Sequence, residues 1–136
     1  MNSVTTDDKK NSLKKLILSF WNDLWNLQIG NKLLEIKSDT KPWKAPYEIR
    51  RRDQVSITRL RIGHTNVTHA HLMKKENPPI CNRCRCQITV KHILNECPVY
   101  STIRTSLHLD TDLFSCLKSN DIAPVLQFVQ NCNLKI

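Results

Sequence analysis

The chain has 136 residues, enough for one small domain with a thin core, because short chains bury a smaller share of their surface. Two Gly and six Pro argue against a linker or low-complexity protein, and so few Gly disfavour a turn-rich all-β fold relative to helices. Lys and Arg outnumber Asp and Glu by 21 to 12, and the net charge of +9 attracts nucleic acid or an acidic membrane face, unless it serves solubility alone.

The cysteines are the clearest chemical signal in the chain. The six are Cys81, Cys84, Cys86, Cys97, Cys116 and Cys132. The N-terminus has no apolar signal segment, and no run of about 18 apolar residues predicts a transmembrane helix. We therefore expect an intracellular protein, in the nucleus or the cytoplasm. In a reducing compartment, Cys clustered with His indicates a metal site before disulfides.

The first part of the chain predicts a tail and a helix. Residues 1–12 are polar and predict a disordered tail, and residues 13–46 predict an amphipathic helix followed by a Pro/Trp loop. The helix is indicated by apolar residues three and four apart, namely Leu13, Leu16, Ile17, Phe20, Trp21, Leu24 and Trp25. Asn11 or Ser12 can cap its start, and Gly30 lies near its predicted end. We expect the apolar face to lie in the core or to dock on a partner domain.

Residues 47–136 predict a helical domain that carries a Cys/His loop at residues 80–98. In the loop before this domain, Trp43 lies between Pro42 and Pro46, and we expect its ring to anchor that loop on the core. The whole pattern predicts a mainly α fold, a small multi-helix domain with an embedded CCHC zinc-knuckle-like loop.

Clear breaks separate the predicted helices of this domain. They cover residues 47–63, 66–73, 99–107, 113–117 and 122–129. Gly63 breaks the first, Thr65 can cap the second, and the Asn77-Pro78-Pro79 sequence stops it.

The Cys/His loop has the spacing of a zinc site, Cys81-x2-Cys84-x7-His92-x4-Cys97. A Cys-x2-Cys turn can point two thiolates at one tetrahedral ion. His92 and Cys97 can converge if the helix ends or loosens before Cys97, which Pro98 favours. Three thiolates and one imidazole predict a closed, structural Zn²⁺ site without an open position for Lewis-acid chemistry.

Other interpretations of the cysteines and histidines stay open. Cys86 could replace Cys84 or face outwards, and the cluster could consist of packed thiols without metal. Cys116 and Cys132 lie on apolar helical stretches and are expected to be core thiols. His64, His69 and His71 lie close together in the sequence, and we expect packing or hydrogen bonding rather than a second metal site.

Basic residues surround the predicted knuckle and recur on the helix before it. The candidate nucleic-acid contacts are Arg50, Arg52, Arg59, Arg61, Lys74, Lys75, Arg83, Arg85 and Lys91. Such side chains can contact phosphates. The aromatic residue on which a retroviral-type knuckle stacks a base is missing, so phosphate contact is expected rather than base recognition.

The sequence offers no catalytic site. The 12 acidic residues are scattered and form no carboxylate cluster with a recognisable nuclease context. No Gly-rich phosphate loop is present, and no Gly-rich turn accompanies any Cys. We therefore expect no enzymatic activity.

Two stretches resemble a known family. They are Arg59-Leu60-Arg61-Ile62-Gly63-His64-Thr65 with Thr68-His69, and Cys81-x2-Cys84 with Thr89-Val90-x-His92-Ile93-Leu94-x2-Cys97-Pro98. They resemble the C-terminal segment of jockey-like non-LTR (LINE) retrotransposon polyproteins, over about residues 13–136. The resemblance implies a position after the reverse transcriptase and RNase H domains and a CCHC set of Cys81, Cys84, His92 and Cys97.

The resemblance implies a role in binding the element's RNA or its target DNA. We therefore expect a zinc-containing accessory module that binds RNA or single-stranded DNA, with the polyprotein's own domains as further partners and no membrane. The alternative is a protein-docking segment, or a decayed transposon fragment without independent activity.

Overall fold

The computed structural model describes residues 5–43, 49–118 and 121–136. Its helices are α1 (Thr6–Asn26), η1 (Lys32–Glu35), α2 (Arg51–Ile62), α3 (Asn66–Lys74), η2 (His92–Glu96), η3 (Pro98–Tyr100), α4 (Ser101–Ser106), α5 (Leu113–Lys118) and α6 (Ala123–Asn131). The described residues form no strand, and one isolated antiparallel bridge joins Ile80 to Gln87. The predicted mainly α fold with a Cys/His loop is confirmed.

Helix α1 begins earlier than the apolar pattern indicates. The backbone N–H of Asp8 donates to Thr5 Oγ1 at 3.1 Å, and the N–H of Thr5 donates back to the Asp8 carboxylate at 3.1 Å. This capping box starts the helix at Thr6, so the prediction of a disordered tail over residues 1–12 is wrong for its described part. Residues 1–4 lie outside the described chain. The helix ends at Asn26, before Gly30.

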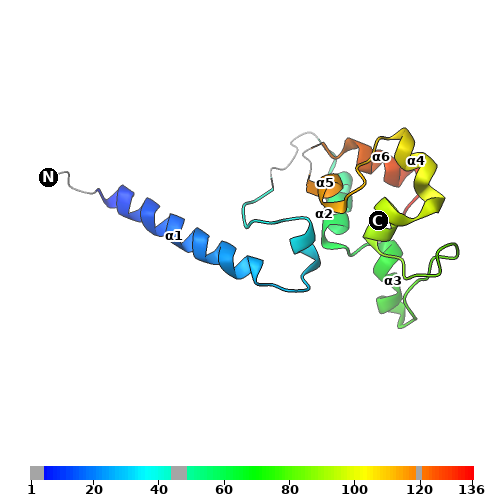
Figure 1. Cartoon of the computed structure of the whole chain (residues 1–136), viewed down its shortest axis with the longest axis horizontal. Coiled ribbons are helices and arrows are strands. Elements are labelled where there is room, and N and C mark those ends of the chain that lie inside the picture. Colours follow the sequence, from blue (N-terminus) through cyan, green and yellow to red (C-terminus); the bar gives the residue numbers. More distant parts are fainter. Residues whose placement is uncertain (1–4, 44–48, 119–120) are drawn as a thin grey trace.

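The apolar face of α1 is not part of the core. Figure 1 shows α1 projecting as a single rod away from the other helices, and none of its residues is buried. Leu16 is 69% exposed and Phe20 65%. The C-terminal end of α1 is joined to the following segment, where Trp25 Nε1 donates to the Lys37 carbonyl at 2.9 Å. The expectation that this face lies in the core is therefore wrong, because helical periodicity defines a face without specifying what covers it.

Helices α2 and α3 follow the predicted signals. Helix α2 turns Ile57 and Leu60 into the core, at 3% and 2% exposed, and ends where Gly63 adopts φ +78°, a left-handed conformation that suits glycine. Thr65 then caps α3 as predicted, accepting a hydrogen bond from the N–H of Thr68 at 3.2 Å. The predicted first helix is shorter than expected, since it begins at Arg51, and residues 47–48 lie outside the described chain.

The core gathers side chains from α2, η2, α5 and α6, which lie together in Figure 1. Its most completely buried members are Phe128, Ile36, Leu94, Leu117 and Val125. Ile36 and the half-buried Trp43 come from the segment that the sequence assigned to a separate N-terminal unit, residues 13–46. That segment is therefore divided: α1 stands apart, whereas η1 and the Trp43 loop belong to the packed body. Trp43 anchors its loop as predicted.

Candidate metal centre

The four predicted ligands meet at one point. Their ligand atoms, from Cys81, Cys84, His92 and Cys97, all lie within 4.8 Å of one another. Sγ of Cys97 lies 3.8 Å from Sγ of Cys81 and 4.0 Å from Sγ of Cys84. In a tetrahedral site with metal–sulfur bonds of about 2.3 Å, two sulfur atoms lie about 3.8 Å apart. The spacing fits one metal ion, and these residues could bind one.

A tight turn aims the first two thiols inward. The N–H of Arg85 donates to the Cys81 carbonyl at 2.8 Å, and the N–H of Cys81 donates to the Cys86 carbonyl at 2.8 Å. Arg85 adopts φ +57°, so the chain reverses at this residue. The N–H of Ile88 then donates to the Pro79 carbonyl at 2.9 Å, which closes the base of the loop. These backbone hydrogen bonds shape the turn that positions Cys81 and Cys84.

A widened helical turn brings in the other two ligands. The segment η2 is a π-helix, in which the N–H of Cys97 donates to the carbonyl of His92, five residues earlier, at 2.7 Å. This turn lets two residues five apart face the same point, which an ordinary α-helical turn does not. The predicted loosening of the helix before Cys97 is confirmed. Both His92 and Cys97 are buried, at 3% and 1% exposed.

Arg104 supports this turn from α4, and sequence reasoning missed it. Its guanidinium donates to the carbonyl of Cys97 at 2.6 Å and to the carbonyl of Ile93 at 3.2 Å. Ile93 lies within the π-helical turn, and Cys97 is the residue that ends it. Arg104 therefore ties the His92/Cys97 half of the cluster to the rest of the fold.

Cys86 lies beside the cluster but outside the ligand set. Its exposed thiol is 3.4 Å from Nδ1 of His92, and the Glu96 carboxylate is 3.7 Å from the same nitrogen. A carboxylate next to the second ring nitrogen of a ligand His is the usual way to orient the imidazole toward a metal. The prediction that left Cys86 out agrees with this placement.

The electrostatics of the cluster suit a cation. The backbone N–H of Cys84 and the side chain of His92 donate to Cys81 and hold the pKa of its thiol well below the ordinary value. Burial, followed by the neighbouring thiols of Cys81 and Cys97, raises the pKa of Cys84 well above its ordinary value. A bound cation would favour the thiolate form of Cys84, which burial and the neighbouring thiols disfavour. Sulfur and imidazole donors match zinc and other thiophilic metals, not Mg²⁺ or Ca²⁺.

The remaining cysteines and histidines take structural positions. Cys116 is 4% exposed and belongs to the core. Cys132 is half-buried and packs against the core, so both thiols take the positions expected. The rings of His64 and His69 stack with centroids 3.7 Å apart, and Thr68 Oγ1 lies 2.6 Å from Nδ1 of His69. Within the described ranges, these histidines belong to no group of metal-ligand type.

The predicted nucleic-acid contacts divide into exposed residues and one structural residue. Eight of the nine are exposed: Arg50, Arg52, Arg59, Lys74, Lys75, Arg83, Arg85 and Lys91. Arg61 is half-buried, donates through Nε to the Leu117 carbonyl at 2.9 Å and places its guanidinium 4.2 Å from the Trp43 ring centre. Arg61 therefore joins α2 to α5 and the Trp43 loop, and its head group is already engaged.

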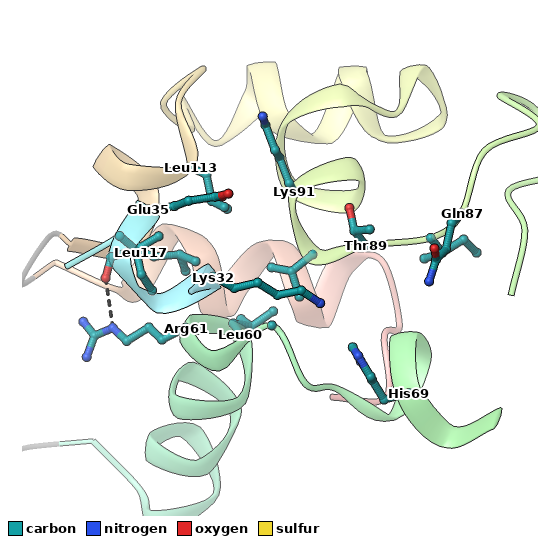
Figure 2. A pocket seen from close by; sticks show the side chains of 14 residues that line it. Lys32, Glu35, Leu60, Arg61, His69, Gln87, Thr89, Lys91, Leu113 and Leu117 are labelled. Atoms are coloured by element: carbon teal, nitrogen blue, oxygen red, sulfur yellow. Dashed lines mark hydrogen bonds between the residues drawn. The ribbon is translucent and has the colours of Figure 1, made fainter. Parts of the chain in front are cut away.

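A small pocket lies against the chain between Cys84 and His92. Its volume is about 200 Å³, and Figure 2 shows side chains from η1, α2, α3, α5 and residues 87–91 around it. Ile88 and Val90 line this pocket beside core residues such as Leu60 and Leu117, which joins the knuckle to the fold. Lys32 lines the same pocket as Arg61 and Lys91, and it was not among the cations predicted from the sequence.

Comparison with protein-family models, curated proteins and solved structures finds no match to this chain. The resemblance to jockey-like retrotransposon polyproteins therefore stays a prediction. Among the described residues, no helix combines the length and apolar character needed to cross a membrane.

Proposed function

We propose that the chain is a zinc-stabilised, non-catalytic module that binds RNA or single-stranded DNA. The observation that carries this proposal is the convergence of three sulfur donors and one imidazole with spacing for a tetrahedral ion. Cys81, Cys84, His92 and Cys97 would hold the zinc. Bound zinc would supply folding free energy to a loop too short to hold its shape alone. With four protein ligands, no position is left for a reactive water.

The proposed partner follows from charge. The chain carries a net charge of +9, and the knuckle displays Arg83 and Arg85 on its exposed turn, with Lys74 and Lys75 just before it. Cationic groups on a rigid loop bind phosphates and release counterions, which makes binding strongly dependent on salt. The resemblance to LINE polyproteins supports the same partner, with the element's RNA or target DNA as the ligand.

The test is a titration of labelled single-stranded RNA and DNA with the metal-loaded chain, followed by fluorescence anisotropy over a range of salt. We expect binding that weakens steeply as salt rises, and much weaker binding by the Cys84→Ser variant. A metal-loaded protein that leaves the anisotropy unchanged at low salt would contradict the proposal.

The exposed face of α1 favours a second candidate, docking on another protein domain. Leu13, Ile17 and Phe20 are each more than half exposed and lie on one side of the helix. An uncovered apolar stripe of this length is typical of an interaction surface. By the resemblance, the partner would be the RNase H or reverse transcriptase domain of the parent polyprotein. Co-purification with that domain, lost in a Phe20→Glu variant and kept in a Lys15→Glu variant, would support docking. Equal recovery of both variants would exclude it.

A further inference from the structure

A second basic surface lies away from the knuckle. Helix α2 and the C-terminal part of the chain, from α6 onward, enclose a groove of about 1010 Å³. Among the described residues that line it, the cationic ones are Arg50, Arg51, Arg52, Arg59 and Lys135, and the acidic one is Asp53. None of the residues between Cys81 and Cys97 lines it. The groove is therefore a separate cationic site with a charge balance that favours an anion.

The position of three of these arginines is unfavourable for the helix that carries them. Arg50 is the N-cap of α2, and Arg51 and Arg52 are its first two residues. The N-terminus of a helix has a partial positive charge, which cations destabilise. Within the described chain, none of the three forms an ion pair with a carboxylate. An anionic ligand at this place would relieve the repulsion.

Apolar side chains also line the groove, and a hydrogen bond joins α2 to the end of the chain. From α6 onward the groove is lined by Leu126, Val129 and Leu134 together with the polar Gln130, Asn133 and Lys135. Arg59 Nη1 donates to a main-chain oxygen of Ile136 at 2.9 Å. A concave surface that combines several cations with apolar side chains suits a single strand, which can offer both its phosphates and its unstacked bases. A duplex keeps its bases stacked inside, so its bases cannot contact the apolar side chains.

We infer that this groove binds the sugar–phosphate backbone of single-stranded nucleic acid, with Arg51 and Arg52 as phosphate contacts and the half-buried Leu126 and Leu134 facing the bases. The inference rests on the proposed function and assigns its main contact surface to α2 and α6, whereas the knuckle holds the fold and adds a smaller contribution. Since the arginines contact phosphates, the site accepts both RNA and DNA strands.

The test compares three double variants that each remove two positive charges. Arg51→Gln/Arg52→Gln alters the groove, Arg83→Gln/Arg85→Gln alters the knuckle, and Lys14→Gln/Lys15→Gln alters α1 as the matched control for net charge. Each metal-loaded protein is titrated with labelled single-stranded RNA, single-stranded DNA and duplex DNA at several salt concentrations. Thermal unfolding of each variant is measured in parallel.

We expect the groove variant to bind both single strands at least about tenfold more weakly than the control, with a salt slope smaller by about 1.4 for two lost phosphate contacts. Its melting temperature should equal or exceed that of the wild type, because the substitutions remove cations from a helix N-terminus. Weakened binding with a preserved fold separates a lost contact from a lost structure.

Three results would overturn the inference. If the groove variant binds like the control while the knuckle variant is weakened, the proposed function stands and the groove does not bind the strand. If the wild type binds duplex as tightly as single strands and through the groove, the single-strand assignment is wrong. If the wild type binds no nucleic acid at low salt, the proposed function fails together with the inference.

Discussion

Replacing Arg104 with Ala tests whether contacts behind the ligands hold the metal centre in shape. The guanidinium donates to the Cys97 and Ile93 carbonyls, at 2.6 Å and 3.2 Å. A hydrogen bond to a charged group contributes about 1.5–3 kcal/mol. Because Arg104 is only half-buried, solvent screens part of this contribution. We expect Arg104→Ala to lower the free energy of unfolding by roughly 2–4 kcal/mol. The loss for Arg104→Lys should lie between zero and the loss for Arg104→Ala, because an ammonium group can keep one of the two hydrogen bonds.

Urea unfolding of the metal-loaded proteins, followed by circular dichroism, measures this loss. The matched control is Arg59→Ala, which removes one hydrogen bond from an exposed arginine to a main-chain oxygen of Ile136, at 2.9 Å. That control should lose less than about 1 kcal/mol. A loss for Arg104→Ala that is no larger than the control's would refute the reasoning, because the two arginines would then be equivalent.

Two further substitutions test the α3 region. Thr65 is 3% exposed and caps α3, so Thr65→Ala should lower the free energy of unfolding by about 1–2 kcal/mol in urea titrations. Thr5 caps α1 in an exposed position, so Thr5→Ala should lower it by less. Burial and the neighbouring His64 lower the pKa of His69, so the fold favours its neutral form. That contribution is complete above the unfolded pKa, about 6.5, and is lost as pH falls below it. Between neutral pH and about pH 5.5, the free energy of unfolding should therefore fall more for the wild type than for His69→Gln. Urea titrations of both proteins at the two pH values measure this, and equal losses would contradict the prediction.

Local signals predicted much of the fold. The spacing of Cys81, Cys84, His92 and Cys97 predicted their convergence, because turn geometry and one loosened helical turn are short-range properties. The cap at Thr65 was predicted for the same reason. The early start of α1 also had a local signal, the pair Thr5 and Asp8 three residues apart, which the apolar series from Leu13 onward obscured.

Features that depend on tertiary placement were not predictable in the same way. The periodicity of α1 did not reveal that its apolar face lies outside the core, since that depends on which surfaces remain free after the rest packs. The bonds of Arg104 to the π-helical turn depend on how α4 lies against η2. The sequence alone makes Arg61 look like one more surface cation. In the structure, however, its head group donates to the Leu117 carbonyl and lies over the Trp43 ring.

Metal content decides the central claim most directly. The chain, purified without chelator, should contain one zinc per molecule by elemental mass spectrometry. Cys84→Ser should contain none, because it removes one of four ligands, whereas Cys86→Ser should keep the full amount, because its thiol lies outside the ligand group. Metal-free wild type, or zinc retained by Cys84→Ser and lost by Cys86→Ser, would contradict the proposed centre.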